Sequence, residues 1–152
     1  MPQIRSIQIS DDYKTILVGT FGGEIWELST KENKLSSAVR FTYYKPILRG
    51  HFHAGKQSKN EIWGLAFNPV DTDIYYTCGD DATLRVWSMT SKTMIALLHT
   101  NLDMNGVEIK PDDKGFYLDN VRGRSIAVSP DGFNIVVGFK DGAILMYDRE
   151  NK

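Results

Sequence analysis

The sequence predicts an all-β fold built from three copies of one small antiparallel sheet. A segment of alternating apolar and polar residues at 5–19 returns without a gap at 124–138, with Arg5 matching Arg124 and Gly19 matching Gly138. A third copy lies between them, at 50–88. No stretch of useful length has the apolar period of a helix. An internal repeat of strands and turns therefore organises the chain.

Each copy is expected to form a series of hairpins. In the first, alternation over 5–10, a turn at Asp11-Asp12 and an apolar run over 15–19 predict two strands. Third strands are expected at 22–29, 81–88 and 141–148, and fourth strands at 46–49 and 93–98. In the third copy, residues 148–152 follow the third strand, and no fourth strand is expected within them.

The copy at 50–88 is the best preserved, and it is typical of one blade of a WD-repeat β-propeller. It carries Gly50-His51, then Trp63, a turn at 79–83 and Trp87-Ser88. In the WD-repeat pattern a loop histidine, a threonine of the second strand, a turn aspartate and a tryptophan of the third strand hydrogen-bond to one another. Four residues occupy these positions: His51, Thr77, Asp81 and Trp87. We expect them to form a structural network, because buried polar groups need partners.

The predicted fold is therefore a partial WD-repeat β-propeller with three blades of four-stranded antiparallel sheet, the third lacking its outer strand. The blades are expected at about 4–49, 50–99 and 123–152, with an insertion at 100–122. Propellers close with about 4 to 8 blades. We therefore expect these residues to be a segment of a larger propeller, or to be completed by self-association across exposed blade edges.

Composition sets limits on location and partners. Hydrophobic residues make up 41% and charged residues 24% of the chain, and the net charge of -1 predicts no global attraction to nucleic acid or membrane. No apolar run approaches the roughly 20 residues that span a bilayer. The N-terminus lacks the apolar core of a signal peptide, so a cytoplasmic location is expected. The single cysteine, Cys78, lies in an apolar run and is expected to be a buried thiol.

Several segments resemble the propeller repeats of the echinoderm microtubule-associated protein-like (EML) family. These are 47–51 (Ile-Leu-Arg-Gly-His), 61–69, 77–81, and 23–28 (Gly-Glu-Ile-Trp-Glu-Leu). The resemblance implies a non-enzymatic cytoskeletal scaffold that binds tubulin, microtubules or other proteins, at the cytoskeleton or in the cilium or axoneme. The sequence departs from the family in its long insert at 101–122 and in lacking the family's N-terminal coiled coil and hydrophobic motif.

A candidate protein-binding face is expected where the innermost strands begin. Trp63 stands at this position in the middle repeat, and Arg5 and Arg124 stand there in the other two. Arginine and tryptophan often anchor protein interfaces. The alternative, that Trp63 packs between blades, remains open.

A second candidate is a basic and aromatic patch within 34–59, a stretch that contains no acidic residue. Its members are Arg40, Tyr43, Tyr44, Lys45, Arg49, Lys56 and Lys59. Such a patch suits an acidic partner, either tubulin or a nucleic acid. A solvated loop with its aromatic rings packed against the blade is the open alternative.

No cofactor, metal site or catalytic group is predicted. Residues 50–57 miss a phosphate-binding loop because Gln57 replaces the required Ser or Thr and no helix follows. Residues 101–112 mimic only part of a Ca²⁺ loop, and His51 and His53 lack a third metal ligand. There is also no set of nucleophile, base and orienting group.

Two other functional classes remain open. One is a WD-repeat adaptor in ciliary transport or ubiquitin-ligase substrate choice, although Thr90 stands where substrate receptors usually have Arg. The other is an RNA-binding propeller that uses the basic patch.

Overall fold

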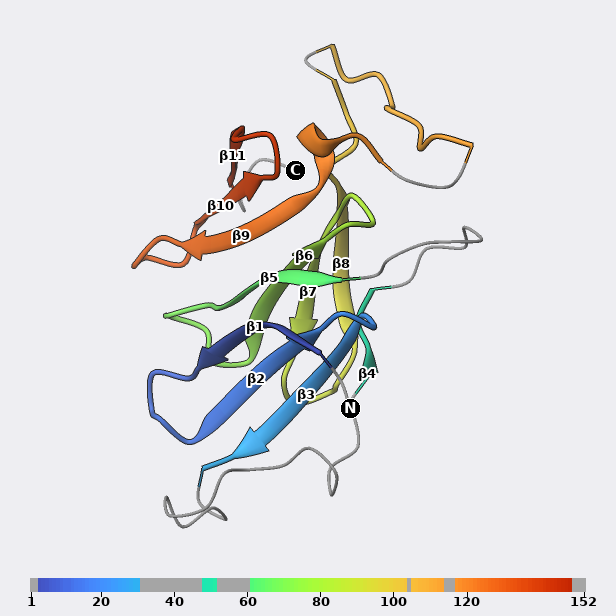
Figure 1. Cartoon of the computed structure of the whole chain (residues 1–152). Helices are drawn as coiled ribbons and strands as arrows, with labels where there is room; N and C mark the ends of the chain where they lie inside the picture. The colour runs from blue at the N-terminus through green and yellow to red at the C-terminus, as the bar shows by residue number, and fades with distance from the viewer. Residues whose placement is uncertain (1–2, 31–47, 52–60, 104, 114–116, 149–152) are drawn as a thin grey trace.

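The computed structural model describes residues 3–30, 48–51, 61–103, 105–113 and 117–148, which form three antiparallel sheets (Figure 1). Blade 1 contains β1 (Ile4–Ile9), β2 (Thr15–Thr20), β3 (Glu24–Ser29) and β4 (Leu48–Arg49). Blade 2 contains β5 (Ile62–Phe67), β6 (Ile74–Gly79), β7 (Thr83–Ser88) and β8 (Met94–His99). Blade 3 contains β9 (Gly123–Val128), β10 (Asn134–Phe139) and β11 (Ile144–Asp148). Each sheet is a simple meander in chain order.

The turn between the second and third strands has the same backbone form in all three blades. Gly23 in blade 1 and Gly142 in blade 3 have φ values of 77° and 92°, in the left-handed region that glycine enters freely. Blade 2 has Ala82 at this position, with φ of 56°. The turn therefore holds an unfavourable conformation only in the blade that carries the polar network.

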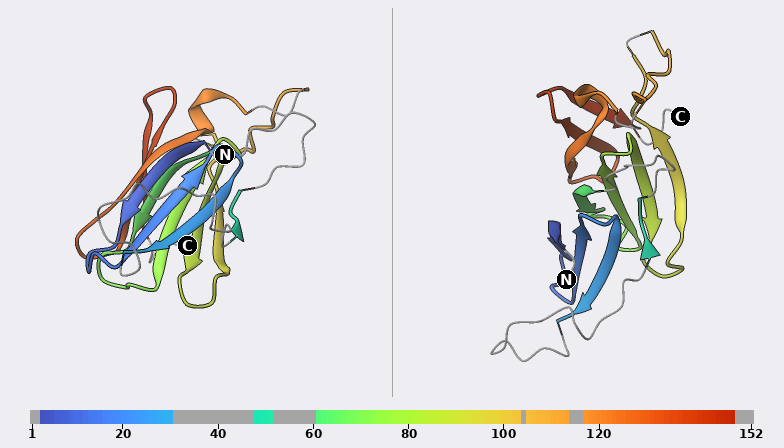
Figure 2. Two further views of the ribbon diagram at one scale, coloured as in Figure 1. Left: turned by 60° about the horizontal axis from the view of Figure 1, so that its bottom comes forward. Right: turned by 45° about the vertical axis from the view of Figure 1, so that its right-hand side comes forward.

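Blade 2 lies between the other two blades, and Figure 2 shows the three sheets following one another in chain order. The innermost strands β1, β5 and β9 contact their neighbours in turn. Every residue of β6 is buried, because blade 1 covers one face of this strand and blade 3 covers the other. Tyr75 packs toward blade 1 with Leu17 and Ile25, whereas Tyr76 packs toward blade 3 with Val137. Strand β6 therefore consists of consecutive buried residues and lacks the alternation of apolar and polar residues that a strand with one exposed face has.

Glycine and a larger side chain alternate where neighbouring blades meet. Between blades 1 and 2, a Cβ added to Gly19 would lie 2.7 Å from Cγ2 of Ile62, so only glycine leaves room for that isoleucine. Between blades 2 and 3, Cys78 occupies the position of Gly19, and Gly123 occupies that of Ile62. A Cβ on Gly123 would lie 2.5 Å from Sγ of Cys78. Each contact pairs one small residue with one larger residue.

The all-β class, the antiparallel blades and the three-stranded third blade are confirmed. The fourth strand predicted at 93–98 is observed as β8, and that predicted at 46–49 is observed at Leu48–Arg49, since 46–47 lie outside the described residues. Within the described parts of the 100–122 insertion, Leu102 forms an isolated bridge with Glu108, and a 3-10 helix spans Asp119–Val121. None of the described segments forms a helix with the length and apolarity needed to cross a bilayer. The larger ring stays a prediction.

Candidate protein-interaction site

Blade 2 brings together the four residues of the predicted network. Nδ1 of His51 lies 2.8 Å from a carboxylate oxygen of Asp81, and Nε2 lies 2.8 Å from Oγ1 of Thr77. The indole N–H of Trp87 donates to the same Thr77 oxygen over 2.7 Å. With the proton of His51 on Nδ1, Thr77 donates to Nε2 and every donor in the row is used once. The row joins the loop after β4, strand β6, the β6–β7 turn and strand β7.

Two further residues, Thr83 and Arg85, complete the network and were not identified from the sequence. Arg85 donates to Oδ2 of Asp81 over 2.8 Å, to the carbonyl of Gly50 over 2.8 Å and to the hydroxyl of Thr83 over 3.0 Å. Thr83 donates to Oδ1 of Asp81 over 2.8 Å. The spacing of Arg85 four residues after Asp81, across a tight turn, is the signal that could have revealed this pair.

The row of Thr77, His51 and Asp81 has the order of a catalytic hydroxyl, base and acid, but its setting is structural. Thr77, His51 and Asp81 are 0%, 1% and 5% exposed. The Thr77 oxygen, which would have to attack a substrate, already accepts the indole N–H of Trp87. The hydroxyl is also fully buried, so the row acts as a clamp, a buried hydrogen-bond network that holds the strands of the blade together.

The clamp favours the ionised form of Asp81. Burial by itself would raise the pKa of this carboxyl, but the contacts from His51, the guanidinium of Arg85 and the hydroxyl of Thr83 outweigh it and lower the pKa from 3.8 to about 2. The folded state therefore favours the ionised carboxylate of Asp81 more strongly than the unfolded chain does.

The stability of the chain should consequently fall in acid. Because the folded-state pKa of Asp81 is below the unfolded value, its contribution of about 2 kcal/mol is complete above pH 4 and is lost as the pH falls toward 2. Urea unfolding of the chain and of the Asp81→Asn variant, measured between pH 5 and pH 2, checks this. The difference in unfolding free energy between the two proteins should shrink by about 2 kcal/mol. A difference that stays constant over this range would contradict the assignment.

The structure also brings together Arg5, Trp63 and Arg124. Each lies at or next to the first residue of its blade's innermost strand. The guanidinium carbon of Arg5 lies 5.0 Å from the centre of a Trp63 ring, and that of Arg124 lies 4.9 Å from it. The indole is thus flanked by one cation from each neighbouring blade, and each contact is worth about 0.5 to 1 kcal/mol when partly exposed. Trp63 is half-buried, so it both packs between blades and faces the surface.

Two carboxylates pair with the guanidinium groups of Arg5 and Arg124, and neither carboxylate was predicted as a site residue from the sequence. Arg5 donates from Nε to Glu61 over 2.6 Å, and Arg124 donates from Nη1 to Asp80 over 2.5 Å. Both arginine side chains remain about one quarter exposed. Each guanidinium has five N–H donors, more than these bonds use. The cluster can therefore accept a hydrogen-bond acceptor from outside without breaking its own ion pairs.

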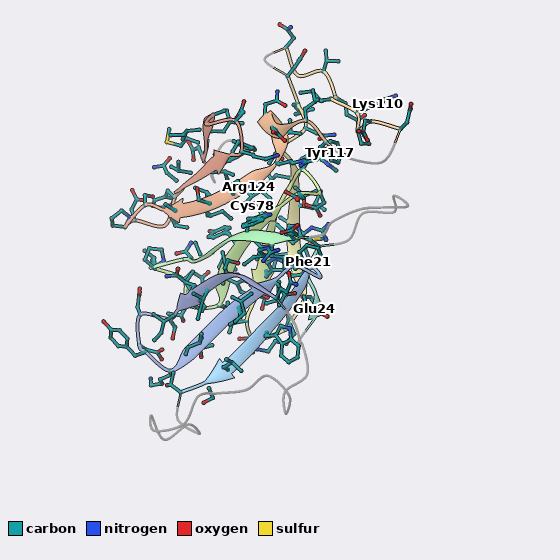
Figure 3. The ribbon with its side chains drawn as sticks, viewed as in Figure 1. Phe21, Glu24, Cys78, Lys110, Tyr117 and Arg124 are labelled. Atoms are coloured by element: carbon teal, nitrogen blue, oxygen red, sulfur yellow. The ribbon has the colours of Figure 1, made fainter. Side chains whose placement is uncertain are left out.

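The cluster extends onto the β2–β3 turn. The ring of Phe21 lies 5.0 Å from the guanidinium carbon of Arg5 and is 37% exposed. Figure 3 shows Phe21 on this turn, Glu24 at the start of β3 and Arg124 on β9. The indole N–H of Trp63 is buried and has no hydrogen-bond partner among the described residues. We define Arg5, Phe21, Trp63 and Arg124 as the Arg–Trp face.

The basic and aromatic patch falls almost wholly outside the described residues. Arg40, Tyr43, Tyr44, Lys45, Lys56 and Lys59 lie in the ranges 31–47 and 52–60, and for Arg49 only the backbone, in β4, is described. His53 and Gln57 also lie outside the described residues. The patch therefore remains a prediction from sequence.

The remaining polar motifs serve local structure. The Asp103 carboxylate accepts the backbone N–H groups of Asn105 and Val107, each over 2.8 Å, and so closes the turn of the Ca²⁺-like loop. Within the described ranges, no three His, Cys, Asp or Glu side chains are grouped as they would be around a metal ion. Cys78 is fully buried, and burial raises the pKa of its thiol to about 12, so the reactive thiolate is disfavoured.

Comparison with known proteins agrees with this architecture. Residues 44–88 match the family described as WD domain, G-beta repeat. The chain is 31% identical over 143 residues to the ciliary WD repeat-containing protein ctxp80 of Euplotoides octocarinatus, an alignment covering 93% of this chain and 17% of that protein. It is 30% identical over 90 residues to the WD repeat-containing protein VIP3 of Arabidopsis thaliana, covering 59% of this chain and 26% of that protein.

The chain thus spans only about a sixth to a quarter of the length of these relatives. The match covers most of blade 2, which is also the blade with the complete clamp. With three antiparallel blades side by side, the fold is that of a partial WD-repeat β-propeller.

Proposed function

We propose that the chain is a non-enzymatic protein-interaction scaffold and that its partner docks on the Arg–Trp face. The observation that carries this proposal is the half-buried Trp63 held between Arg5 and Arg124, three residues supplied by three different blades. Such anchors are common at the centre of protein interfaces. The rigid sheets beneath hold them in position, so binding costs little side-chain ordering.

The finer proposal is an EML-like, microtubule-associated propeller protein whose partner is tubulin. Its support is the resemblance of the blade sequences, together with the similarity to a protein described as ciliary. Two partly exposed arginines suit a partner that offers carboxylates. Microtubule co-sedimentation and RNA filter binding, each measured across a salt series, test this choice. Pelleting with microtubules supports the microtubule proposal, and binding to RNA alone would favour the RNA-binding class. If the chain binds neither microtubules nor RNA, a WD-repeat adaptor with another protein partner is favoured.

The Trp63→Ala variant should bind microtubules at least about 30-fold more weakly, the effect of losing an interface anchor worth about 2 kcal/mol. Trp63→Phe keeps an aromatic face between the arginines and should lose less. Lys14→Ala is the matched control, because Lys14 is an exposed cation in the β1–β2 hairpin, at the opposite end of the strands. Unfolding curves for each variant separate binding from folding. A folded Trp63→Ala protein with unchanged binding would refute the role of this face.

A further inference from the structure

The outer strand of blade 2, β8, has an open edge: β7 pairs with one side of the strand, and no described strand pairs with the other. All six residues of β8 are exposed, and its sequence contains no acidic residue, lysine, arginine or proline. Four large apolar side chains are between 36% and 55% exposed: Met94, Ile95, Leu97 and Leu98. Edge strands usually carry charged residues or proline, which prevent pairing with other chains. Strand β8 lacks these residues, so its edge is open to a further strand.

The strand register shows which backbone groups of β8 point outward. The N–H of Thr100 donates to the carbonyl of Ala82 over 2.9 Å, so these residues form a hydrogen-bonded pair at the end of the β7–β8 ladder. Hydrogen-bonded pairs alternate with non-bonded pairs along an antiparallel ladder. Leu98 is therefore bonded to β7, whereas Leu97 and His99 direct their N–H and C=O groups away from it. Two donors and two acceptors face outward, at the spacing that a further strand matches.

The position of β8 in the blade keeps this edge free of neighbouring blades. The sheets meet through their inner strands, since β5 contacts β1 and β2 of blade 1 and β9 of blade 3. The main contacts of β8 are with β7 of its own sheet. In the right-hand view of Figure 2, β8 (yellow) runs along the outer side of blade 2. A neighbouring blade therefore covers the faces of this sheet and leaves the edge of β8 uncovered.

A cavity of about 600 Å³ lies beside the C-terminal end of β8. Leu98, Leu102 and Tyr147 form its apolar wall. In a strand added to β8, the side chain opposite Leu98 points to the same side of the sheet as Leu98. That side faces blade 3, because Leu84, the β7 partner of Leu98, packs with Val137 of blade 3. An apolar side chain of the added strand would therefore reach this wall.

The cavity also has a polar wall, formed by Asn101 and Glu108. Asn101 is only 2% exposed. Its Nδ2 donates to the carboxylate of Glu108 over 3.3 Å and to the carbonyl of Ile109 over 3.2 Å, and these two acceptors fix the orientation of the amide. Its Oδ1 is buried and has no hydrogen-bond partner among the described residues. A buried acceptor without a partner is costly, so a donor brought by an occupant of the cavity would be favoured.

We propose that β8 is a second docking surface, to which an extended segment of a protein partner adds as a strand. The backbone of the segment pairs with Leu97 and His99, and an apolar side chain opposite Leu98 enters the cavity. Charge adds a further requirement, because residues 101–113 carry four carboxylates and one cation. The carboxylates belong to Asp103, Glu108, Asp112 and Asp113, and the cation is Lys110. The segment that fits best is therefore apolar in its centre and carries lysine or arginine at its flanks.

Fluorescence anisotropy with a labelled peptide, acetyl-Lys-Val-Thr-Val-Thr-Val-Lys-amide, tests the docking. The peptide should bind saturably to the chain. The same peptide with glutamate in place of both lysines should bind at least about tenfold more weakly, because the carboxylates of 101–113 repel it. A lysine peptide that shows no saturable binding, or a glutamate peptide that binds equally well, would overturn the proposal.

Two N-methylated forms of the lysine peptide identify the contact as strand pairing. Successive N–H groups of a strand point to opposite edges, so methylation of alternate residues blocks either the edge that faces β8 or the edge that faces solvent. One form should bind at least about tenfold more weakly than the parent peptide, and the other should bind as the parent does. Equal affinities of the two forms would show that the peptide does not pair along a strand.

Variants of the chain place the contact on β8. Leu97→Pro removes an N–H that points outward and is not used within the blade, so the fold should be kept while peptide binding falls about tenfold. Leu102→Arg places a cation in the cavity wall and should weaken binding of the lysine peptide by a similar factor.

Val70→Arg is the matched control, because Val70 is an aliphatic residue of the β5–β6 loop and is 65% exposed. Its peptide binding should equal that of the unmodified chain, and unfolding curves of all three variants separate binding from folding. If binding survives in folded Leu97→Pro and Leu102→Arg chains, or is lost in Val70→Arg, the contact does not lie on β8 and the proposal fails.

Discussion

Replacing Asp81 with alanine is expected to lower the free energy of unfolding by about 3 to 5 kcal/mol, the cost of removing one partner from a buried charged network. The carboxylate accepts hydrogen bonds from His51, Thr83 and Arg85, and it lies almost wholly out of water. Its removal would leave a guanidinium that is only 12% exposed without its counter-charge. Urea unfolding at neutral pH, followed by tryptophan fluorescence, measures the loss.

The matched control is Asp141→Ala. Asp141 occupies the corresponding turn of blade 3, is exposed and accepts the backbone N–H of Ala143 over 2.9 Å. Because water can replace this bond, the expected cost is below about 1 kcal/mol. Similar losses for the two variants would show that Asp81 acts as an ordinary turn residue, and the clamp would then not account for the stability of blade 2.

The clamp could be predicted because the sequence resembles the WD-repeat pattern, in which a histidine before the blade, a threonine on the second strand and a tryptophan on the third hydrogen-bond to one another. The resemblance assigned His51, Thr77 and Trp87 to these positions, and the hairpins of blade 2 bring them together. The repeat of Arg5 at Arg124 likewise predicted that both stand where innermost strands begin.

The partners of those residues could not be predicted, since they belong to other blades. Glu61 reaches Arg5 across the contact of blades 1 and 2, and Asp80 reaches Arg124 across that of blades 2 and 3. No local sequence pattern encodes a contact between residues so far apart in the chain. The contacts of Gly19 with Ile62 and of Cys78 with Gly123 could not be predicted from the sequence either. They depend on which face of each strand meets the next blade.

The size matching between Cys78 and Gly123 leads to the second large expected effect on stability, which a double-mutant cycle can measure. Gly123→Ile should destabilise the chain by about 3 kcal/mol, because its Cβ would lie 2.5 Å from Sγ and 2.7 Å from Cβ of Cys78. Cys78→Gly should cost about 2 kcal/mol, because it leaves a cavity between blades 2 and 3. The double variant recreates the glycine and isoleucine pair found between blades 1 and 2.

If blade contacts are governed by this exchange of volume, the double variant should be more stable than the sum of the single losses predicts, by about 2 kcal/mol. Urea unfolding of the four proteins under one condition gives this coupling free energy directly. As an internal control, Cys78→Gly combined with Asp141→Ala should be additive, because Asp141 lies in an exposed turn rather than at the blade contact. Additive losses for Cys78→Gly and Gly123→Ile would mean that the two residues do not share space.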